Sequence, residues 1–257
     1  MNRVFLLAHQ DDEMGVFTQI KEGIIKNDNI YIFFLTNGNI SKITNNSIIA
    51  QREKESLNVL KILGVKKKNI FFLGKNLKIN SYELHKKLNE IYLILERFLK
   101  ELKNDSLIYT HAWEGGNTDH DSCYVLTLKL LKKFFNKNSG FQFSLYNSAN
   151  MPFKFYKVMQ PIKSNGKILT KNINLHDKIL FIYLLFYYKS QYKIWLGLYP
   201  FVIGKILFNN YGSLQVINPK KLLKKPHKKN LWYEKRGFLS YSSLKFFFDK
   251  FLNNIYR

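Results

Sequence analysis

Short runs of apolar residues recur along the first part of the chain, and each is closed by polar or turn-forming residues. The clearest runs lie at residues 4–8, 30–36, 70–73 and 106–110, with a weaker candidate at 142–146. β-Branched and aromatic side chains dominate them. Runs of this length bounded by turn residues are typical of buried strands in a parallel sheet.

Helical patterns separate these runs. They cover residues 13–26, 47–63, 81–103 and 120–136. The third is the clearest, because its apolar residues recur at alternating steps of four and three. Gly64 can end the second helix, and Ser81 can cap the start of the third. Strands that alternate with helices over connections of this length predict an α/β fold with a mostly parallel sheet.

The segment 179–208 has a different character, because it is apolar and aromatic in two runs separated by Lys189 and Lys193. Neither run reaches the roughly 20 residues that span a bilayer. Two alternatives stay open: a pair of core helices, or an element at a membrane surface, where Trp195, tyrosines and flanking lysines would be typical. A lysine-rich loop bounded by prolines follows at residues 219–229.

The positive charge is concentrated in the second half of the chain. The 257 residues carry a formal net charge of +23. Residues 122–257 hold three acidic and 24 basic residues, whereas residues 1–121 hold 15 acidic and 17 basic residues. A lysine-rich coding bias explains part of this excess, but its position favours an anionic surface or an anionic substrate for the second half.

The composition excludes several classes of protein. A hydrophobic content of 46% with 16% aromatic residues excludes global disorder. The single cysteine, Cys123, excludes a disulfide framework and a cysteine-ligated zinc finger. The first apolar run is shorter than the roughly 7–15 residues of a secretory signal, and acidic residues follow it. We therefore expect a cytoplasmic protein, either free or peripheral at the inner face of the membrane.

Histidine and aspartate residues cluster after two of the predicted strands. His9 and Asp12 follow the first strand, and Asp119 and His120 follow the fourth, after the double glycine at 115–116. The carboxyl ends of parallel strands meet at one edge of a sheet, so the two clusters can converge. An aspartate pair after one strand is common as a helix cap. Two such clusters with imidazole and carboxylate groups favour a catalytic zinc site with an open position.

The two clusters resemble the motifs of a known family. Residues 8–13 (Ala-His-Gln-Asp-Asp-Glu) resemble the Ala-His-Pro-Asp-Asp-Glu signature of the PIG-L/LmbE-like, zinc-dependent N-acetylglucosaminyl deacetylases, and residues 115–120 are similar to their Gly-Gly-His-Pro-Asp-His element. Residues 36–38 and 52–55 fit the family order, and 188–191 and 231–234 resemble tail motifs of bacterial members tied to surface-glycan synthesis. The resemblance spans nearly the whole chain and implies a three-layer Rossmann-like fold.

The same resemblance implies roles for individual residues. His9, Asp12 and His120 would be the zinc ligands, although another divalent metal also suits such a donor set. Asp11 would be the general base that takes a proton from the attacking water. Asp119 would lie behind the ligands and orient one of them.

Two positions depart from the family pattern. Gln10 replaces a proline, which removes no ligand. Asn117 stands where the family has a histidine that stabilises the oxyanion, and an asparagine amide can donate a hydrogen bond but cannot transfer a proton. We therefore expect Asn117 in the catalytic site, with His111 as the nearest histidine that could assist. Arg52 and His111 are expected on the substrate side, with Arg52 contacting the sugar or a phosphate.

These expectations define a metal-dependent amidohydrolase that converts the acetamide of an N-acetylated amino sugar to an amine and acetate, in the synthesis of a surface glycan or glycolipid. A nucleotide-linked and a lipid-linked sugar both stay open, as do contact with an anionic membrane and the oligomeric state. Residues 1–150 would form the α/β catalytic core, and 151–257 a basic, aromatic extension of helices and loops that completes the fold and lines the substrate site.

The alternative function is a basic protein that binds nucleic acid or a membrane surface and carries a vestigial site. The basic half holds few arginines and no recognisable nucleic-acid motif, which argues against a nucleic-acid partner.

Overall fold

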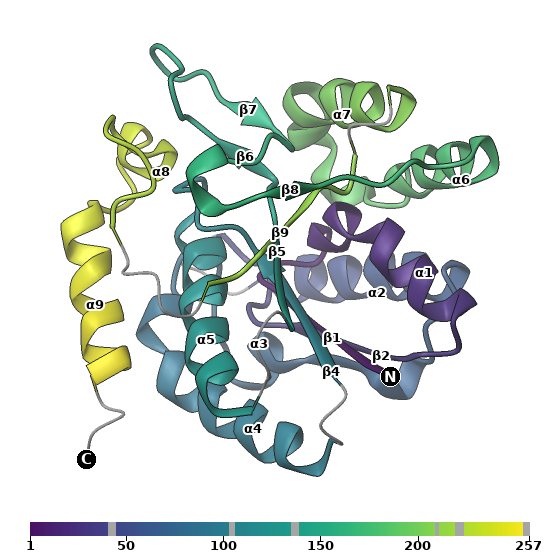
Figure 1. Cartoon of the computed structure of the whole chain (residues 1–257), viewed down its shortest axis with the longest axis horizontal. Helices are drawn as coiled ribbons and strands as arrows, with labels where there is room; N and C mark the ends of the chain where they lie inside the picture. Colours follow the sequence, from purple (N-terminus) through teal and green to yellow (C-terminus); the bar gives the residue numbers. More distant parts are fainter. Residues whose placement is uncertain (41–44, 103–105, 135–138, 209–210, 219–223, 254–257) are drawn as a thin grey trace.

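The computed structural model describes residues 1–40, 45–102, 106–134, 139–208, 211–218 and 224–253. Within these ranges the central element is a seven-stranded sheet of order β3-β2-β1-β4-β5-β9-β8 (Figure 1). Its strands are β1 (Asn2–Leu7), β2 (Asn29–Phe34), β3 (Ile70–Phe72), β4 (Ser106–His111), β5 (Gly140–Phe143), β8 (Ile168–Leu169) and β9 (Leu214–Val216). Neighbours from β3 to β5 pair in parallel, while β9 is antiparallel to both β5 and β8. The expected mostly parallel α/β fold is confirmed.

Strand β1 shows why the sheet lies between two helical layers. Phe5 and Leu7 belong to one apolar cluster and Val4 and Leu6 to another, and all four side chains are fully buried. Successive side chains of a strand point to opposite faces of the sheet, so β1 is buried on both. This central position fixes the carboxyl end of β1 in the interior, where the first histidine–aspartate motif begins.

The helices divide between the two faces. Helices α1 (Phe17–Ile25), α2 (Asn46–Ile62), α6 (Leu175–Leu185) and α7 (Tyr192–Leu207) contribute to the cluster that contains Phe5. Helices α3 (Leu73–Asn76), α4 (Leu88–Glu101), α5 (Thr118–Phe134), α8 (Trp232–Lys235) and α9 (Tyr241–Asn253) contribute to the cluster that contains Val4. The arrangement has three layers, as expected of a Rossmann-like fold. A small antiparallel hairpin of β6 (Tyr146–Asn147) and β7 (Lys157–Val158) stands beside the sheet (Figure 1).

The third helix begins later than its sequence pattern predicts. Helix α4 starts at Leu88, and the expected cap at Ser81 is wrong. Tyr82 has a positive φ of 69°, and the backbone N–H groups of Tyr82 and Leu84 both donate to the carboxylate of Asp119. This turn supplies hydrogen bonds to the functional region in place of a first helical turn, which the apolar periodicity alone could not reveal.

The segment 179–208 forms most of the helix pair α6 and α7. Within the described residues, no helix combines the length and apolar character that crossing a bilayer requires. The short strands β8 and β9, which extend the sheet beyond β5, carried no detectable pattern. Part of the expected lysine-rich loop, residues 219–223, lies outside the described residues.

Candidate metal and substrate site

The carboxyl ends of β1 and β4 carry the two histidine–aspartate motifs. The strands are parallel neighbours in the sheet, so the loop after β1 and the start of α5 meet at one edge. His9 and Asp12 come from the first and His120 from the second, and one ligand atom from each lies within 4.8 Å of the others. The structure thus brings together the three residues expected to hold a metal.

His120 offers the most direct test of whether this group suits a metal ion. Its side chain is buried, and neither ring nitrogen has a hydrogen-bond partner. Nε2 lies 3.4 Å from Oδ1 of Asp12, but without hydrogen-bonding geometry. A buried imidazole left unpaired is costly, and a metal ion would supply the missing partner. Burial, reinforced by His111, lowers the pKa of His120 to about 4, so the ring is neutral as a ligand must be.

His9 lies between two carboxylates. Its Nδ1 is 3.2 Å from Oδ2 of Asp12, and its Nε2 is 3.0 Å from Oδ2 of Asp119. Burial alone would lower the pKa of His9, but Asp12 and Asp119 outweigh it and raise the pKa to about 10. In the metal-free protein His9 therefore holds a proton, and a metal ion that binds its nitrogen must displace that proton.

Asp119 is fixed behind the group formed by His9, Asp12 and His120, which we call the metal-binding group for the role proposed below. Its carboxylate accepts the backbone N–H groups of Tyr82 and Leu84, the latter at 3.1 Å, as well as contacting His9. A carboxylate held by several donors in this way fixes the orientation of the imidazole that it contacts. The expectation that Asp119 orients a ligand stays a prediction, and this geometry supports it.

Asp11 lies at the edge of the same group in an unusual backbone conformation. Its φ is 135°, a backbone conformation that residues other than glycine rarely adopt. Its backbone N–H donates to Oε2 of Glu13 at 3.0 Å, and its Oδ1 accepts from Nη2 of Arg52 at 3.1 Å. Burial raises the pKa of Asp11 to about 6 although the Arg52 cation opposes the shift. A carboxylate with a pKa near neutrality can take up and release a proton.

The guanidinium of Arg52 donates hydrogen bonds to several groups of the protein. Besides Asp11 it donates to the carbonyls of Gln10 at 2.9 Å and Gly38 at 3.1 Å. In the amide orientation that satisfies both side chains, Gln191 accepts from Nε of Arg52 at 3.1 Å. Arg52 lines the cavity as expected, but most of its donors are already engaged by the protein.

Residues 188–191, one of the two tail motifs, contact helix α2. Ser190 donates its backbone N–H to Oε1 of Glu55 at 2.9 Å and its hydroxyl to Oε2 at 2.5 Å. Together with the Gln191–Arg52 pair, these bonds join two motifs that are far apart in the sequence. The second half of the chain therefore completes the support of Asp11.

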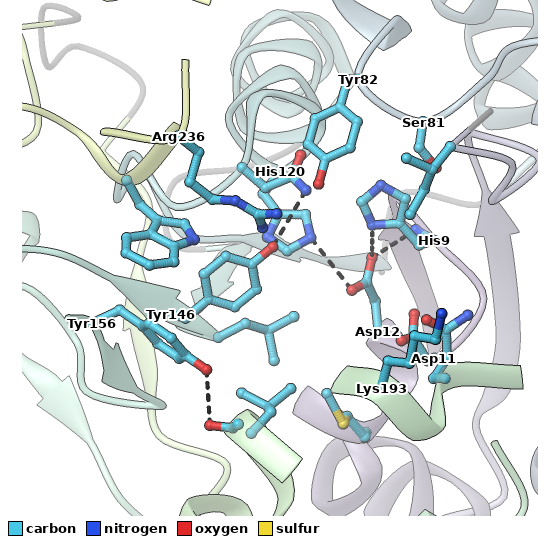
Figure 2. A pocket seen from close by; sticks show the side chains of 18 of the residues that line it. His9, Asp11, Asp12, Ser81, Tyr82, His120, Tyr146, Tyr156, Lys193 and Arg236 are labelled. Carbon is cyan, nitrogen blue, oxygen red and sulfur yellow. Dashed lines mark hydrogen bonds and ion pairs between the residues drawn. The ribbon is translucent and has the colours of Figure 1, made fainter. Parts of the chain in front are cut away.

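Asn117 and Tyr146 form a polar pair on the cavity wall. The Asn117 side chain accepts from the N–H of Asp119 at 2.8 Å, which orients its Nδ2 to donate to the Tyr146 hydroxyl at 3.3 Å. Because this oxygen accepts from Asn117, its own hydrogen can be donated into the cavity. Burial raises the pKa of the Tyr146 phenol well above its usual value, so the hydroxyl stays protonated. Figure 2 shows this hydroxyl directed toward His120.

Glu114 fixes the position of Tyr146. Its Oε1 accepts the backbone N–H groups of Leu145 at 2.8 Å and Tyr146 at 3.1 Å. Its Oε2 accepts from Asn147 at 3.1 Å and from the hydroxyl of Ser144. A fully buried carboxylate thus anchors the start of the β6–β7 hairpin.

His111 lies behind the metal-binding group. It is fully buried, its ring stacks on His120 at 3.9 Å between centroids, and its Nε2 accepts the N–H of Ala8 at 3.1 Å. It is not among the described residues that line the cavity. The contact with substrate expected from its place in the sequence therefore has no support in the structure, because the strand end directs the ring inward beneath His120.

A cavity of about 330 Å³ opens over the metal-binding group, within the usual range for small-molecule sites (Figure 2). Four aromatic side chains line it: Tyr82, Tyr146, Tyr156 and Trp232. Lys193 and Arg236 add positive charge. The sequence interpretation missed all of these except the 231–234 motif that contains Trp232, because none lies near the two histidine–aspartate motifs in the sequence.

Comparison with known proteins agrees with this geometry. The profile of the PIG-L family, described as GlcNAc-PI de-N-acetylase, matches residues 4–131. A zinc-inhibited teicoplanin deacetylase, Orf2, superposes with a TM-score of 0.62 at 12% identity, covering 86% of this chain and 100% of its own. N,N'-diacetylchitobiose deacetylase from Pyrococcus horikoshii superposes with a TM-score of 0.55 at 17% identity, covering 85% of this chain and 84% of its own.

The fold also serves another reaction. A 4-carboxy-2-hydroxymuconate hydratase from Pseudomonas putida superposes with a TM-score of 0.54 at 13% identity, covering 87% of this chain and 98% of its own. No curated protein sequence matches the chain. The structural likenesses therefore establish the fold, and the profile match establishes the family. Residues 4–131, which carry His9, Asp12 and His120, belong to the PIG-L family.

Proposed function

We propose that this protein is a metal-dependent deacetylase that hydrolyses the acetamide of an N-acetylated amino sugar to a free amine and acetate. The observation that carries the proposal is the convergence of His9, Asp12 and His120 beside Asp11 at the floor of one cavity. Titratable groups with shifted pKa values beside a cavity are typical of catalytic sites.

His9, Asp12 and His120 are the groups that would hold the metal, and their nitrogen and oxygen donors suit zinc. When bound, such an ion polarises a carbonyl and lowers the pKa of a water molecule. Asp119 keeps the ring of His9 in place through its contact at 3.0 Å.

Asp11 is the proton carrier of the reaction. Its carboxylate accepts a proton from water as the oxygen of that water forms a bond to the acetamide carbon. It then gives the proton to the amide nitrogen as the carbon–nitrogen bond breaks, which leaves acetate and the amine. Its pKa of about 6 suits both steps near neutral pH. We assign Arg52 to positioning Asp11, because its donors are engaged by Asp11 and by backbone carbonyls.

Tyr146 is the hydrogen-bond donor for the carbonyl oxygen, which gains negative charge as water attacks. Its half-buried ring lies 5.4 Å from that of His120 between centroids and its hydroxyl is oriented by Asn117, so it can donate without reorganisation. A fixed donor at a developing oxyanion is among the largest contributions to catalysis. Asn117 thus acts through Tyr146.

The rest of the cavity suits a sugar that carries an anionic linkage. Aromatic faces such as those of Tyr156 and Trp232 pack against the apolar side of a sugar ring, while Lys193 and Arg236 can pair with a phosphate. These four residues come from 151–257, which we assign to substrate recognition. A nucleotide-linked or lipid-linked N-acetylglucosamine is the substrate type that this composition favours.

The test is release of acetate from free, nucleotide-linked and lipid-linked N-acetylglucosamine by purified protein. We expect activity that disappears after chelation and returns with zinc, and a preference for the linked sugars. Full activity in metal-stripped protein, or inactivity of the zinc-loaded protein toward every N-acetylated sugar, would contradict the proposal.

A further inference from the structure

Helix α7 and Phe208, which directly follows it, expose several large apolar side chains to solvent. Tyr192, Leu196, Phe201 and Phe208 are exposed, Leu196 to 86% and Phe208 to 77%. At about 100° per residue they are spread over the broad half of the helix that faces away from the buried Leu198 and Val202. Single exposed apolar residues are ordinary, but a group of several on one element is typical of an interaction site.

Helix α6 carries an apolar stripe. Leu175, Ile179, Tyr183 and Phe186 are exposed at steps of four, four and three, which places them on one side of this helix. Helix α6 packs against α7, and both lie along the same edge of the molecule (Figure 1). The exposed apolar residues of α6 and α7 therefore lie on neighbouring elements.

The β6–β7 hairpin extends this region. Phe153 and Phe155 at its turn are exposed, Phe153 to 85%. The Tyr156 hydroxyl next to them donates to the carbonyl of Gly197 at 2.8 Å, which joins the hairpin to α7. We call these exposed residues of α6, α7 and the hairpin turn the α6–α7 surface.

The charge around the α6–α7 surface has one sign. Residues 146–208 hold nine lysines and a single acidic residue, Asp177. Asp177 is already paired with Lys21 from α1. Lys171 is likewise paired with Glu22 of α1. Exposed aromatic and aliphatic side chains interspersed with the remaining lysines match the boundary of an anionic bilayer, where apolar side chains enter the acyl region and lysines meet lipid headgroups.

We propose that the α6–α7 surface docks on the surface of an anionic lipid bilayer, with α6 and α7 lying in its headgroup region. Helix α7 has 16 residues, too few to cross a bilayer, so it lies along the interface. Gly197 and Leu198 of α7 also line the cavity, so docking brings the mouth of the cavity to the bilayer. The docking itself does not depend on the reaction.

Co-sedimentation of the full chain with vesicles tests this inference. We expect the protein to pellet with vesicles of phosphatidylcholine and phosphatidylglycerol at low salt. It should stay in the supernatant with phosphatidylcholine alone, and high salt should release it, because salt screens the lysines. Failure to pellet with the anionic vesicles would overturn the inference.

The apolar part is tested by the triple variant Leu196→Ser, Phe201→Ser, Phe208→Ser. These side chains are exposed, so the fold should persist, and the affinity for anionic vesicles should fall at least about tenfold. The matched control is Leu93→Ser with Phe246→Ser, which are also exposed but lie on α4 and α9. Equal losses of vesicle affinity in the two proteins would show that exposed apolar residues contribute wherever they lie, and would contradict a defined surface.

The basic part is tested by changing Lys154, Lys157, Lys189 and Lys205 to glutamine. We expect the affinity for anionic vesicles to fall by about tenfold or more. The control changes the exposed lysines 66, 67 and 68 in the same way and should bind as the parent does.

Light scattering tests whether a second copy of the chain covers this surface instead. A dimer that the triple serine variant abolishes, in a protein that does not bind vesicles, would assign the surface to a second copy and overturn docking. Acetate release from a water-soluble sugar reports separately on the proposed reaction.

Discussion

Nη2 of Arg52 lies 3.1 Å from Oδ1 of Asp11, and the same nitrogen donates to the carbonyl of Gln10 at 2.9 Å. One guanidinium therefore holds both the side chain of Asp11 and the backbone just before it. Asp11 keeps a φ of 135° within this support. The pair connects helix α2 to the loop after β1, and the Arg52 cation opposes the rise that burial causes in the pKa of Asp11.

Removing the carboxylate of Asp11 should abolish proton transfer and leave the metal group intact. We expect Asp11→Asn to lower kcat by about 10²–10⁴-fold, the range for a lost general base. Bound zinc, measured by mass spectrometry, should be unchanged. Asp249→Asn on α9, where the side chain is 46% exposed, is the control. Retention of more than half of the activity in Asp11→Asn would remove Asp11 from the mechanism.

Removing the charge of Arg52 should change the pH profile. Burial raises the pKa of Asp11 to about 6, and the Arg52 cation opposes that rise. In Arg52→Gln the pKa should therefore be higher. Because the reaction needs the carboxylate, activity that normally falls below about pH 6 should fall at a higher pH. The profile of kcat/KM against pH measures this shift. A raised KM with an unshifted profile would instead assign Arg52 to substrate binding.

His120 should be required for metal binding. His120→Ala removes one of the three nitrogen and oxygen donors that converge at the site, and we expect zinc content and activity to fall together. His176→Ala, at a side chain that is 83% exposed, should keep both. Full zinc occupancy in His120→Ala would show that the metal binds elsewhere.

Tyr146→Phe removes one hydroxyl and keeps the ring. A lost donor to a developing oxyanion lowers kcat by about 10²–10³-fold, and we expect a loss in that range with KM and zinc content near those of the parent. Tyr156→Phe is the matched control, because its hydroxyl donates to Gly197 and not toward the metal group. Equal small losses in both variants would contradict the role of Tyr146.

Gly116 allows the backbone of Tyr146 to approach the loop that precedes α5. A Cβ at this position would lie 1.9 Å from the Tyr146 carbonyl oxygen, so Gly116→Ala should displace the hairpin and destabilise the fold by about 1–3 kcal/mol. Gly204→Ala on α7 meets nothing within 4 Å and should leave Tm unchanged or higher. Thermal unfolding compares the two, and an unchanged Tm in Gly116→Ala would refute the close approach.

The convergence of His9, Asp12 and His120 could be predicted from the sequence because each half of the group is local. His9 and Asp12 are three residues apart after β1, His120 follows β4, and parallel neighbouring strands bring such ends together. Tyr146 could not be predicted in this way. Its place depends on the buried Glu114, which binds the backbone of the hairpin across more than thirty positions.

The same reasoning explains two further differences. The backbone N–H of Tyr82 donates to Asp119, and the spacing of apolar residues carries no information about this long-range hydrogen bond. Helix α7 is apolar on nearly all sides, so its pattern could not distinguish its core face from its exposed face. The residues of the histidine–aspartate group could be predicted from local spacing. The residues of the cavity wall could not, because long-range contacts set their positions.

The proton on His9 has a consequence for how the site would take up a metal ion. Without a metal, the cationic ring lies between the carboxylates of Asp12 and Asp119 and offsets their repulsion. An ion that binds a ring nitrogen has to compete with this proton, so we expect the affinity of the site for a divalent metal to increase as the pH is raised.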